Sequence, residues 1–227
     1  MKILTIANAK GGVGKTSIAL GCALEKALGP WPWRVLCYDA DSQRSLTSWA
    51  DEVVGRGLPG VLREDVPADA PHGVVIVREF TGAQAVRADA AALGADLVII
   101  DCKLIRTDDQ AQLMRQQAAL RMADVALVPV RASQLDLISQ GEGIDLLAAA
   151  PGPALRYVLS AVRAPFVDAA RSALEGLGCA VLAAVIHEGQ DWNVFTMQAC
   201  IEAPRRLRGR PGVEVRAVLR EIGMATK

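Results

Sequence analysis

The sequence predicts an α/β fold in which helices cover both faces of a mostly parallel, twisted β-sheet, giving a three-layer sandwich. Apolar runs of strand length alternate with longer mixed stretches, and the connections between them are short. Hydrophobic residues make up 52% of the chain but aromatic residues only 4%, which favours close-packed helices on a buried sheet. The first apolar run ends in a glycine-rich loop that opens a helix, a common junction in parallel sheets.

In the first half of the chain, short apolar runs predict buried strands, and the longer stretches between them predict helices. Strands are expected at 2–7, 34–39, 73–77 and 95–101, and helices at about 16–28, 45–54, 82–93 and 108–122. The segment 56–72 is rich in Gly, Pro and Asp, so we expect it to be mostly loop.

The same alternation continues to the end of the sequence. Strands are expected at 123–130, 155–162 and 179–186, and helices at 132–150, 165–177 and about 213–222. Strands that alternate with helices form right-handed βαβ units, so neighbouring strands should pair in parallel. We expect one domain, 1–227, that carries a basic segment at 204–227.

Composition and charge restrict the class of protein. Lys and Arg together number 25, as do Asp and Glu, so the formal net charge is zero and the chain as a whole does not indicate a nucleic-acid partner. The five cysteines form no CxxC pair, and no apolar run is long enough to span a bilayer. The N-terminal apolar run is short and lacks the features of a signal peptide. We therefore expect a cytoplasmic protein without disulfides or a zinc site.

The segment "NAKGGVGKTS" at 8–17 fits a phosphate-binding loop of the P-loop NTPase type. Its glycines let backbone N–H groups turn toward phosphate oxygens, and the following helix points its positive end at the same anion. Lys15 supplies charge to the outer phosphates, and the Thr16 hydroxyl is placed to ligate Mg²⁺. The predicted cofactor-binding residues are Lys10, Gly11, Gly12, Val13, Gly14, Lys15, Thr16 and Ser17.

A second lysine, Lys10, stands near the start of the loop. One loop would struggle to bring both Lys10 and Lys15 to the same phosphate. The spacing makes sense if Lys10 reaches the nucleotide of a second subunit and neutralises charge on its leaving oxygens, as an arginine finger does. Catalysis would then require dimerisation.

Three aspartates end predicted strands or follow them closely, where ligands collect in α/β sheets. Asp101 closes its strand and would hold Mg²⁺ through water. Asp39 would orient the Mg²⁺ hydration shell, and Asp41 would position the attacking water. The alternative for Asp39 and Asp41 is a structural one, in which Asp41 or Ser42 caps the helix at 45–54.

These segments resemble the ParA/MinD family of ATPases. "KGGVGKT" resembles the deviant Walker A motif, whose early lysine is the signature residue. "VLCYDADSQRSLTSW" resembles the Asp-x-Asp-Pro-Gln segment, with Ser42 in place of proline, and "ADLVIID" resembles the Walker B strand. "ADVALVPVRASQLDL" resembles the strand and turn that follow, so the resemblance covers about 1–140. It is closest to the small ParF-like plasmid partition ATPases.

The resemblance implies an ATP-sandwich dimer that uses ATP and Mg²⁺ and hydrolyses ATP with Lys10, Lys15 and Asp41 as the catalytic residues. It also implies non-specific DNA binding at the nucleoid, a ParB-like or cargo-adaptor partner that stimulates hydrolysis, and a plasmid, chromosome or protein cluster as cargo. Two alternatives stay open: a MinD-like ATPase that cycles on membranes, and a P-loop metabolic enzyme of the dethiobiotin synthetase type. The last residues, "VEVRAVLREIGMATK", look too weakly apolar for a stable membrane anchor.

The basic segment offers phosphate contacts of the kind that give salt-sensitive, non-specific DNA binding. The alternative is a solvated surface with pairing along the helix, for example between Arg216 and Glu221. The candidate DNA-binding residues are Arg205, Arg206, Arg208, Arg210, Arg216 and Arg220.

Some segments depart from the family pattern. "CKLIRTDD" after Asp101 replaces a Pro- and Gly-containing sensor loop; it is either a variant whose cations meet Asp108 and Asp109, or a loop that contacts phosphate or a regulator. His187 is expected to be a loop residue rather than a catalyst. The two tryptophans of "GPWPWR" either cover the turn or contact a partner.

Overall fold

A computed structural model describes residues 1–63, 66, 72–104, 109–131, 153–189, 191–192, 195 and 207–224 of the chain. The predicted helix at 132–150 lies outside these residues, as do Arg205, Arg206 and residues 105–108 of the "CKLIRTDD" segment.

The strands form one eight-stranded sheet in the order β3-β4-β2-β5-β1-β6-β7-β8, and every neighbouring pair is parallel. The strands are β1 (Lys2–Asn8), β2 (Arg34–Asp39), β3 (Val61–Leu62), β4 (Val74–Glu79), β5 (Leu97–Lys103), β6 (Val125–Val130), β7 (Ala154–Val162) and β8 (Val181–His187). The predicted parallel sheet is therefore confirmed. The shift in strand order around β1 leaves its carboxyl end open for a ligand.

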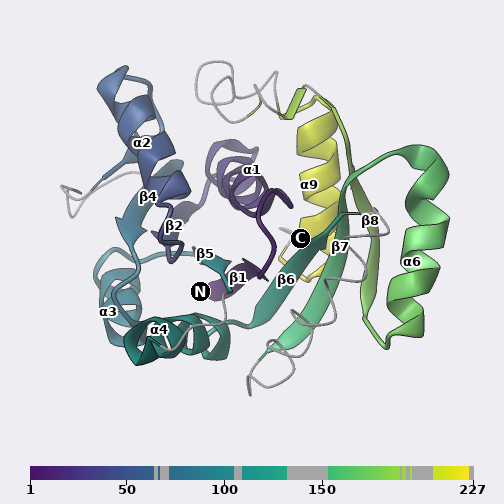
Figure 1. The fold of residues 1–227 in the computed structure, drawn as a ribbon. Helices are drawn as coiled ribbons and strands as arrows, with labels where there is room; N and C mark the ends of the chain where they lie inside the picture. Colours follow the sequence, from purple (N-terminus) through teal and green to yellow (C-terminus); the bar gives the residue numbers. More distant parts are fainter. Residues whose placement is uncertain are drawn as a thin grey trace.

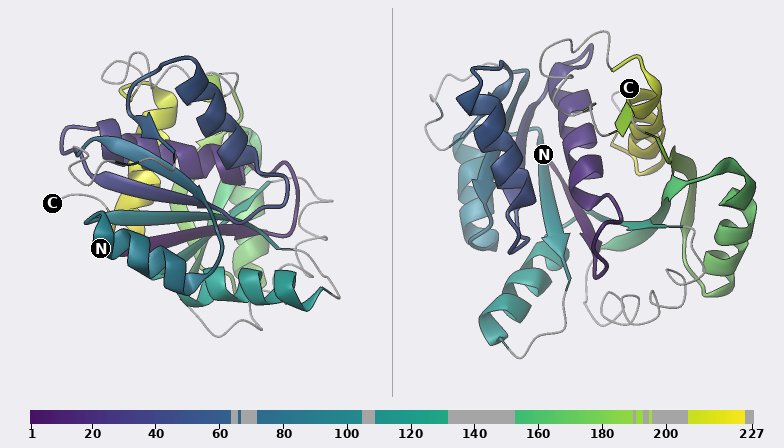
Figure 2. Two further views of the ribbon diagram at one scale, coloured as in Figure 1. Left: turned by 90° about the vertical axis from the view of Figure 1, so that its left-hand side faces the viewer. Right: turned by 45° about the horizontal axis from the view of Figure 1, so that its top comes forward.

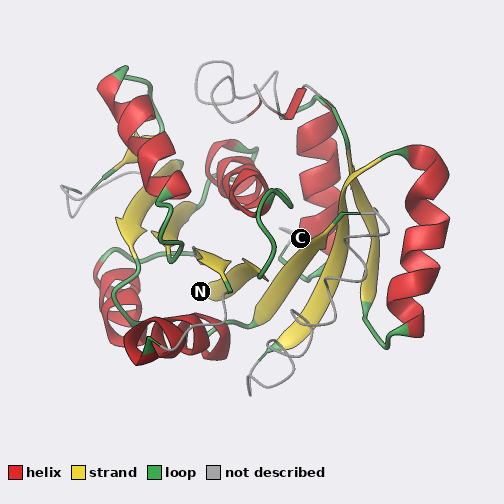
Figure 3. Cartoon of the chain, viewed as in Figure 1, coloured by secondary structure: helices red, strands yellow, loops and turns green. Residues whose placement is uncertain are grey.

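Helices cover both faces of the sheet (Figures 1 and 2). They are α1 (Lys15–Leu28), α2 (Ser45–Gly55), α3 (Ala83–Ala92), α4 (Gln110–Arg121), α6 (Val167–Gly176) and α9 (Arg210–Glu221). Alternate residues of a strand face opposite sides, so Leu4 and Ile6 pack under α1 and its neighbours, and Ile3 and Ala7 belong to the other core. The first core holds α1, α2 and α9, and the second holds α3, α4 and α6 (Figure 3), which confirms the three layers.

Helices α1 and α9 approach each other unusually closely at Gly21. A Cβ atom added to Gly21 would lie 2.9 Å from Cγ2 of Val215 and 3.3 Å from the ring of Trp192. The absence of a side chain at this position lets α9 pack directly on α1. This contact ties the C-terminal helix to the helix that begins at the glycine-rich loop.

Some element boundaries differ from the predictions: β4 and β5 each extend two residues further, to Glu79 and Lys103, and two helix starts differ at prolines. Helix α9 begins at Arg210 rather than near Val213, because Pro211 fits the first turn of a helix. The predicted helix at 165–177 begins with a 3₁₀ turn, η1 (Ala164–Phe166), before α6 starts at Val167. Within the predicted loop at 56–72, β3 adds a two-residue edge strand.

Candidate functional site

The glycine-rich loop joins the end of β1 to the start of α1. Gly12 and Gly14 have φ values of 73° and 86°, in the left-handed region that favours glycine. Cβ atoms added to Gly11 and Gly12 would meet nothing within 4 Å, so the space above the loop is open. The buried Lys15 side chain folds back over the loop, and its Nζ donates to the carbonyl oxygen of Lys10 at 3.2 Å. The loop thus offers an open cradle with a cation at its edge.

Two buried polar side chains support this loop from below. The Asn8 side chain accepts from the backbone N–H of Lys10 at 2.8 Å and donates to the carbonyl of Pro129 at 2.7 Å. Ser160, in β7, donates its hydroxyl to the carbonyl of Val13 at 2.8 Å. Sequence reasoning assigned neither residue a role, although a serine inside the apolar run "LRYVLSAV" is a usable signal. Both contacts fix the loop to neighbouring strands.

Asp101 lies at the centre of the site. It is fully buried, and Thr16 donates its hydroxyl to Asp101 Oδ2 at 2.5 Å, while Oδ1 is buried without a hydrogen-bond partner. Burial raises the pKa of Asp101 to about 7, although the Thr16 hydrogen bond and Lys15 oppose this change. Burial likewise lowers the pKa of Lys15, against the attraction of Asp101 and Asp41. The lysine, the hydroxyl and the two carboxylates therefore share one electrostatic environment.

The register of β2 and β5 places Asp39 directly beside Asp101. Asp39 Oδ2 accepts from the N–H of Thr47 at 2.9 Å, and Oδ1 accepts from the N–H of Asp41 at 3.1 Å. Thr47 lies in the first turn of α2, where backbone N–H groups have no partner within the helix. Asp39, at the end of β2, therefore supplies the acceptor for one of these N–H groups. The structural alternative, a cap of this helix by Asp41 or Ser42, is therefore not the arrangement found.

Asp41 shapes its own loop and stays half-buried. Its Oδ1 accepts from the N–H of Gln43 at 3.0 Å, which closes an Asx-type turn. The residue before α2, Arg44, adopts a left-handed backbone conformation (φ 52°) and forms an ion pair with Glu79. The loop after β2 is thus held at both ends, and Asp41 lies near Lys15 and Asp101.

A cavity of about 510 Å³ lies beside the loop, on the side of β7 and β8. This volume is in the range of small-molecule sites. Its lining includes Gly12, Val13, Gly14, Ser17, Ile18, Arg131, Ser160, Ile186, His187 and Trp192. His187 was expected in a loop, but it is the last residue of β8 and part of the cavity wall.

A buried carboxylate behind this wall holds it in place. Glu214 of α9 accepts from Nδ1 of His187 at 2.9 Å and from Nε1 of Trp192 at 3.0 Å. Sequence reasoning assigned no role to Glu214, because only the tertiary structure brings α9 behind β8. The wall of the cavity therefore depends on the C-terminal helix.

The donor set suits a phosphate-bearing ligand with a hard divalent cation. Backbone N–H groups of the loop and Lys15 would face phosphate oxygens, and Thr16 and Asp101 offer the oxygen ligands that Mg²⁺ prefers. The unpaired Oδ1 of Asp101 is the kind of buried acceptor that such an ion or its water would satisfy. Within the described residues, no cluster of three or more His, Cys, Asp or Glu side chains could hold a metal. A cation here would therefore rely on oxygens of the ligand as well.

The segment after β5 is described only in part. Asp109 caps α4, since its Oδ1 accepts from the N–H groups of Ala111 at 2.9 Å and Gln112 at 3.3 Å. Cys102 is fully buried, and burial raises the pKa of its thiol to about 12, which leaves it unreactive. Lys103 is the last residue of β5.

The structure separates the candidate DNA-binding arginines into paired and solvent-facing residues. Arg210 donates from Nε to Asp191 at 3.0 Å, and Arg216 pairs with Glu25 at 2.9 Å. The pairing suggested for Arg216 with Glu221 is absent, since Glu221 accepts backbone N–H groups of β8 instead. Arg208 and Arg220 are exposed, and neither makes a hydrogen bond or ion pair within the described part of the chain.

Comparison with known proteins agrees with this geometry. Residues 4–193 match the family model described as the CobQ/CobB/MinD/ParA nucleotide binding domain. The chain belongs to this family. A curated family relative, Protein ParA of Rhizobium radiobacter, is 24% identical over 154 residues, which are 65% of this chain. The match spans 57% of the length of that relative.

Solved structures share the fold. The ATP complex of an McdA variant from Cyanothece has a TM-score of 0.68 and 20% identity, covering 100% of this chain and 98% of that one. Cobyrinic acid a,c-diamide synthase from Mycobacterium smegmatis, with bound ADP and magnesium, has a TM-score of 0.56 and 19% identity. That match covers 92% of this chain and 96% of that one.

Proposed function

We propose that this protein is a Mg²⁺-dependent ATPase of the ParA type, which dimerises around ATP, binds DNA non-specifically and positions a cargo. The contact between the Thr16 hydroxyl and the Asp101 carboxylate, directly beneath an open glycine-rich loop, carries the nucleotide part of the proposal. The McdA–ATP complex supports ATP as the nucleotide. The ADP- and magnesium-bound synthase supports the metal.

Each residue has a role that follows from its position. Lys15 and the loop N–H groups would bind the phosphates, and Thr16 and Asp101 would hold Mg²⁺, which neutralises phosphate charge when bound. Asp39 would keep the loop after β2 and the start of α2 in place. Asp41 would orient the attacking water from that loop. The cavity walled by His187 and Trp192 would receive the nucleoside.

Lys10 supports the dimeric part of the proposal. Its backbone N–H donates to Asn8 and its carbonyl accepts from the Lys15 ammonium, and its side chain is half-buried. The side chain would act on the nucleotide of a second copy, as the resemblance implies. ATP would then hold the dimer together, and a partner protein would stimulate hydrolysis and release.

The C-terminal helix favours DNA over a membrane as the surface on which the protein acts. The apolar residues Val215, Val218 and Leu219 of α9 are buried against the core, so they are committed to packing rather than to lipid. Among the helices of the described residues, none has the length and apolar character required to cross a bilayer. Exposed arginines such as Arg208 would contact phosphates.

A metabolic enzyme is the second candidate, since the cobyrinic acid a,c-diamide synthase shares the fold. Such an enzyme would need no second subunit at its nucleotide. Lys10 distinguishes the two candidates. Replacing Lys10 would not impair a ligase-type enzyme, which works without a second subunit. The same replacement would disable an ATPase that works as an ATP-sandwich dimer.

Binding to a random-sequence DNA duplex, with ATP, with ADP and without nucleotide, tests the proposal. We expect binding only with ATP and Mg²⁺, weakening steeply from 50 to about 200 mM salt. Lys15→Ala should lose ATP binding, whereas Lys10→Ala should bind ATP yet remain monomeric by light scattering and lose DNA binding. DNA binding that does not depend on the nucleotide, or the absence of DNA binding, would refute DNA as the surface on which the protein acts. A Lys10→Ala variant that still dimerises with ATP would refute the ATP-sandwich dimer.

A further inference from the structure

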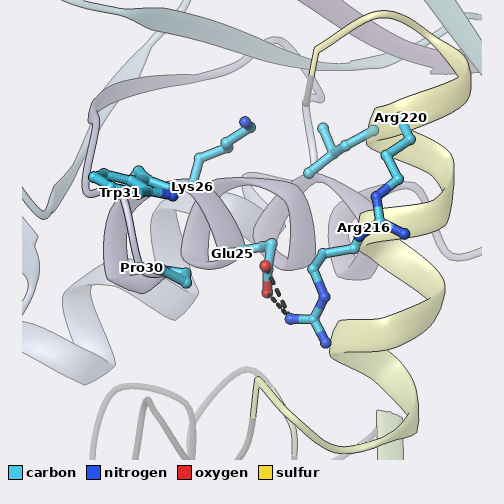
Figure 4. A pocket seen from close by; sticks show the side chains of 8 residues that line it. Glu25, Lys26, Pro30, Trp31, Arg216 and Arg220 are labelled. Carbon is cyan, nitrogen blue, oxygen red and sulfur yellow. Dashed lines mark hydrogen bonds and ion pairs between the residues drawn. The ribbon is translucent and has the colours of Figure 1, made fainter. Parts of the chain in front are cut away.

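A groove between α1 and α9 lies away from the nucleotide site. It has a volume of about 210 Å³, and its charged and aromatic lining residues are Glu25, Lys26, Trp31, Arg216 and Arg220 (Figure 4). Helix α1 begins at the phosphate loop and runs for 14 residues, which is roughly 20 Å. Its last turn, which forms one wall of the groove, therefore lies at the opposite edge of the sheet from the loop. We call this feature the α1–α9 groove.

The lining of the α1–α9 groove carries a net positive charge. Both carboxylate oxygens of Glu25 accept from Nη1 of Arg216, at 2.9 and 3.0 Å, so one cation and the only carboxylate of the lining cancel. Lys26 is only 5% exposed, and its Nζ lies 3.8 Å from the ring centroid of Trp33. Burial lowers the pKa of Lys26, because the groove solvates its charge poorly. An anion seated here would offset that cost.

The rim adds an aromatic surface and another cation. Trp31 is 68% exposed, and Pro30 and Pro32 on either side restrict its backbone. It lies on one side of the groove, and Arg220 lies on the other, one helical turn after Arg216 (Figure 4). The sequence analysis left open whether the two tryptophans of this turn cover it or contact a partner. Trp33 packs over Lys26, which fits the first role, whereas the exposed Trp31 fits the second. An exposed tryptophan beside arginines is typical of surfaces that bind a partner.

We propose that the α1–α9 groove binds a phosphodiester group of DNA, which Arg220 contacts while Trp31 packs against the adjoining nucleoside. The groove is large enough for a phosphate and part of a sugar but too small for a whole folded partner. Cations combined with an aromatic face are the usual means of holding a nucleic-acid strand. Arg208, just before α9, extends the positive charge along the same segment. This inference rests on the proposed DNA-binding function.

The test compares Arg220→Ala and Trp31→Ala with the wild type in ATP-dependent binding to random-sequence DNA over a range of salt concentrations. Arg220→Ala should weaken binding and reduce the slope of log K against log salt by about 1. Trp31→Ala should weaken binding about tenfold with the slope unchanged, because it removes packing and not charge. The matched controls are Arg87→Ala on α3 and Phe166→Ala, which remove an exposed arginine and an exposed aromatic ring elsewhere. Binding of a fluorescent ATP analogue and the melting temperature should be the same in all variants.

The outcomes separate the two proposals. If the wild type binds DNA with ATP but both groove variants bind equally well, the groove inference is wrong and the DNA-binding function stands. A wild type that binds no DNA refutes both. A Glu-rich peptide serves as the competing probe: if the variants lose its binding and keep that of DNA, the groove is a contact for acidic protein segments and the proposal fails.

Discussion

The carboxylate of Glu214 lies 2.9 Å from Nδ1 of His187, which joins the C-terminal helix to the wall of the cavity beside the phosphate loop. The same carboxylate accepts the indole N–H of Trp192, and it is only 8% exposed. A buried carboxylate with two side-chain donors holds both rings in one orientation. Helix α9 therefore contributes to the cavity without lining it.

Replacing Glu214 should change the binding of the nucleoside more than that of the phosphates. Glu214→Gln keeps the volume but leaves one acceptor oxygen for two donors, so we expect ATP to bind about three- to tenfold more weakly. Inorganic triphosphate, which has no nucleoside, should bind as to the wild type. The matched control is Glu221→Gln, whose carboxylate accepts two N–H groups of β8 outside the cavity. Equal weakening for both ligands would contradict the positioning role.

Asp101→Asn should remove the magnesium dependence of ATP binding. The amide keeps a hydrogen-bond acceptor for Thr16 but not the negative charge, so we expect Mg²⁺ to stop strengthening ATP binding in an EDTA–Mg²⁺ titration. In the absence of ligand the variant should be at least as stable as the wild type at pH 8, since burial disfavours the charged Asp101. Asp124→Asn, at the other end of the sheet, is the control. An unchanged magnesium effect would remove Asp101 from the metal site.

Gly21→Ala should destabilise the contact between α1 and α9. The added methyl group would lie 2.9 Å from Val215, and overpacking of this kind costs about 1–3 kcal/mol, which exceeds the gain of about 1 kcal/mol in helix propensity. Val215→Ala should recover part of the loss in a double-mutant cycle. Gly55→Ala in α2, where an added Cβ meets nothing within 4 Å, should not destabilise. Urea unfolding measures all five proteins, and equal stabilities of the wild type and Gly21→Ala would disprove the close approach.

Glu25 should make folding stability depend on pH. Burial raises the pKa of Glu25 above its ordinary value, although Arg216 and Arg220 of α9 and Lys26 of α1 oppose this effect. The folded chain then holds the proton more tightly than the unfolded chain. The free energy of unfolding should therefore fall for the wild type relative to Glu25→Gln as pH rises from about 4.5, and the difference should level off above the raised pKa. A difference that grows in favour of the wild type with rising pH would show that the Arg216 pair outweighs burial.

The layer order and the phosphate loop could be predicted from local pattern. A continuous apolar run such as "ADLVII" can only be buried between two helical layers, and glycines at Gly12 and Gly14 meet a backbone requirement that acts within a few residues. Helix starts were less certain, because a proline such as Pro211 fits either a loop or a first helical turn.

Contacts between distant segments could not be predicted in this way. Asp39, at the end of β2, accepts from a backbone N–H group in the first turn of α2, a role that the sequence analysis considered only as an alternative for its neighbours Asp41 or Ser42. Ser160 reaches Val13, and Arg216 reaches Glu25, across 147 and 191 residues of sequence. In each case packing buries a polar group, and that group forms its hydrogen bond or ion pair with the residue that the fold places next to it.

The sequence by itself determined the strand and helix order, the open phosphate loop with Lys10 and Lys15, and the acids Asp39 and Asp101 near the carboxyl ends of β2 and β5. Only the tertiary structure decided which carboxylates accept hydrogen bonds from backbone N–H groups and which arginines pair with carboxylates. It also decided how α9 reaches the cavity and forms the groove with α1. The reason is physical: propensity and periodicity act over a few residues, whereas burial and pairing of charges depend on where the chain returns in space.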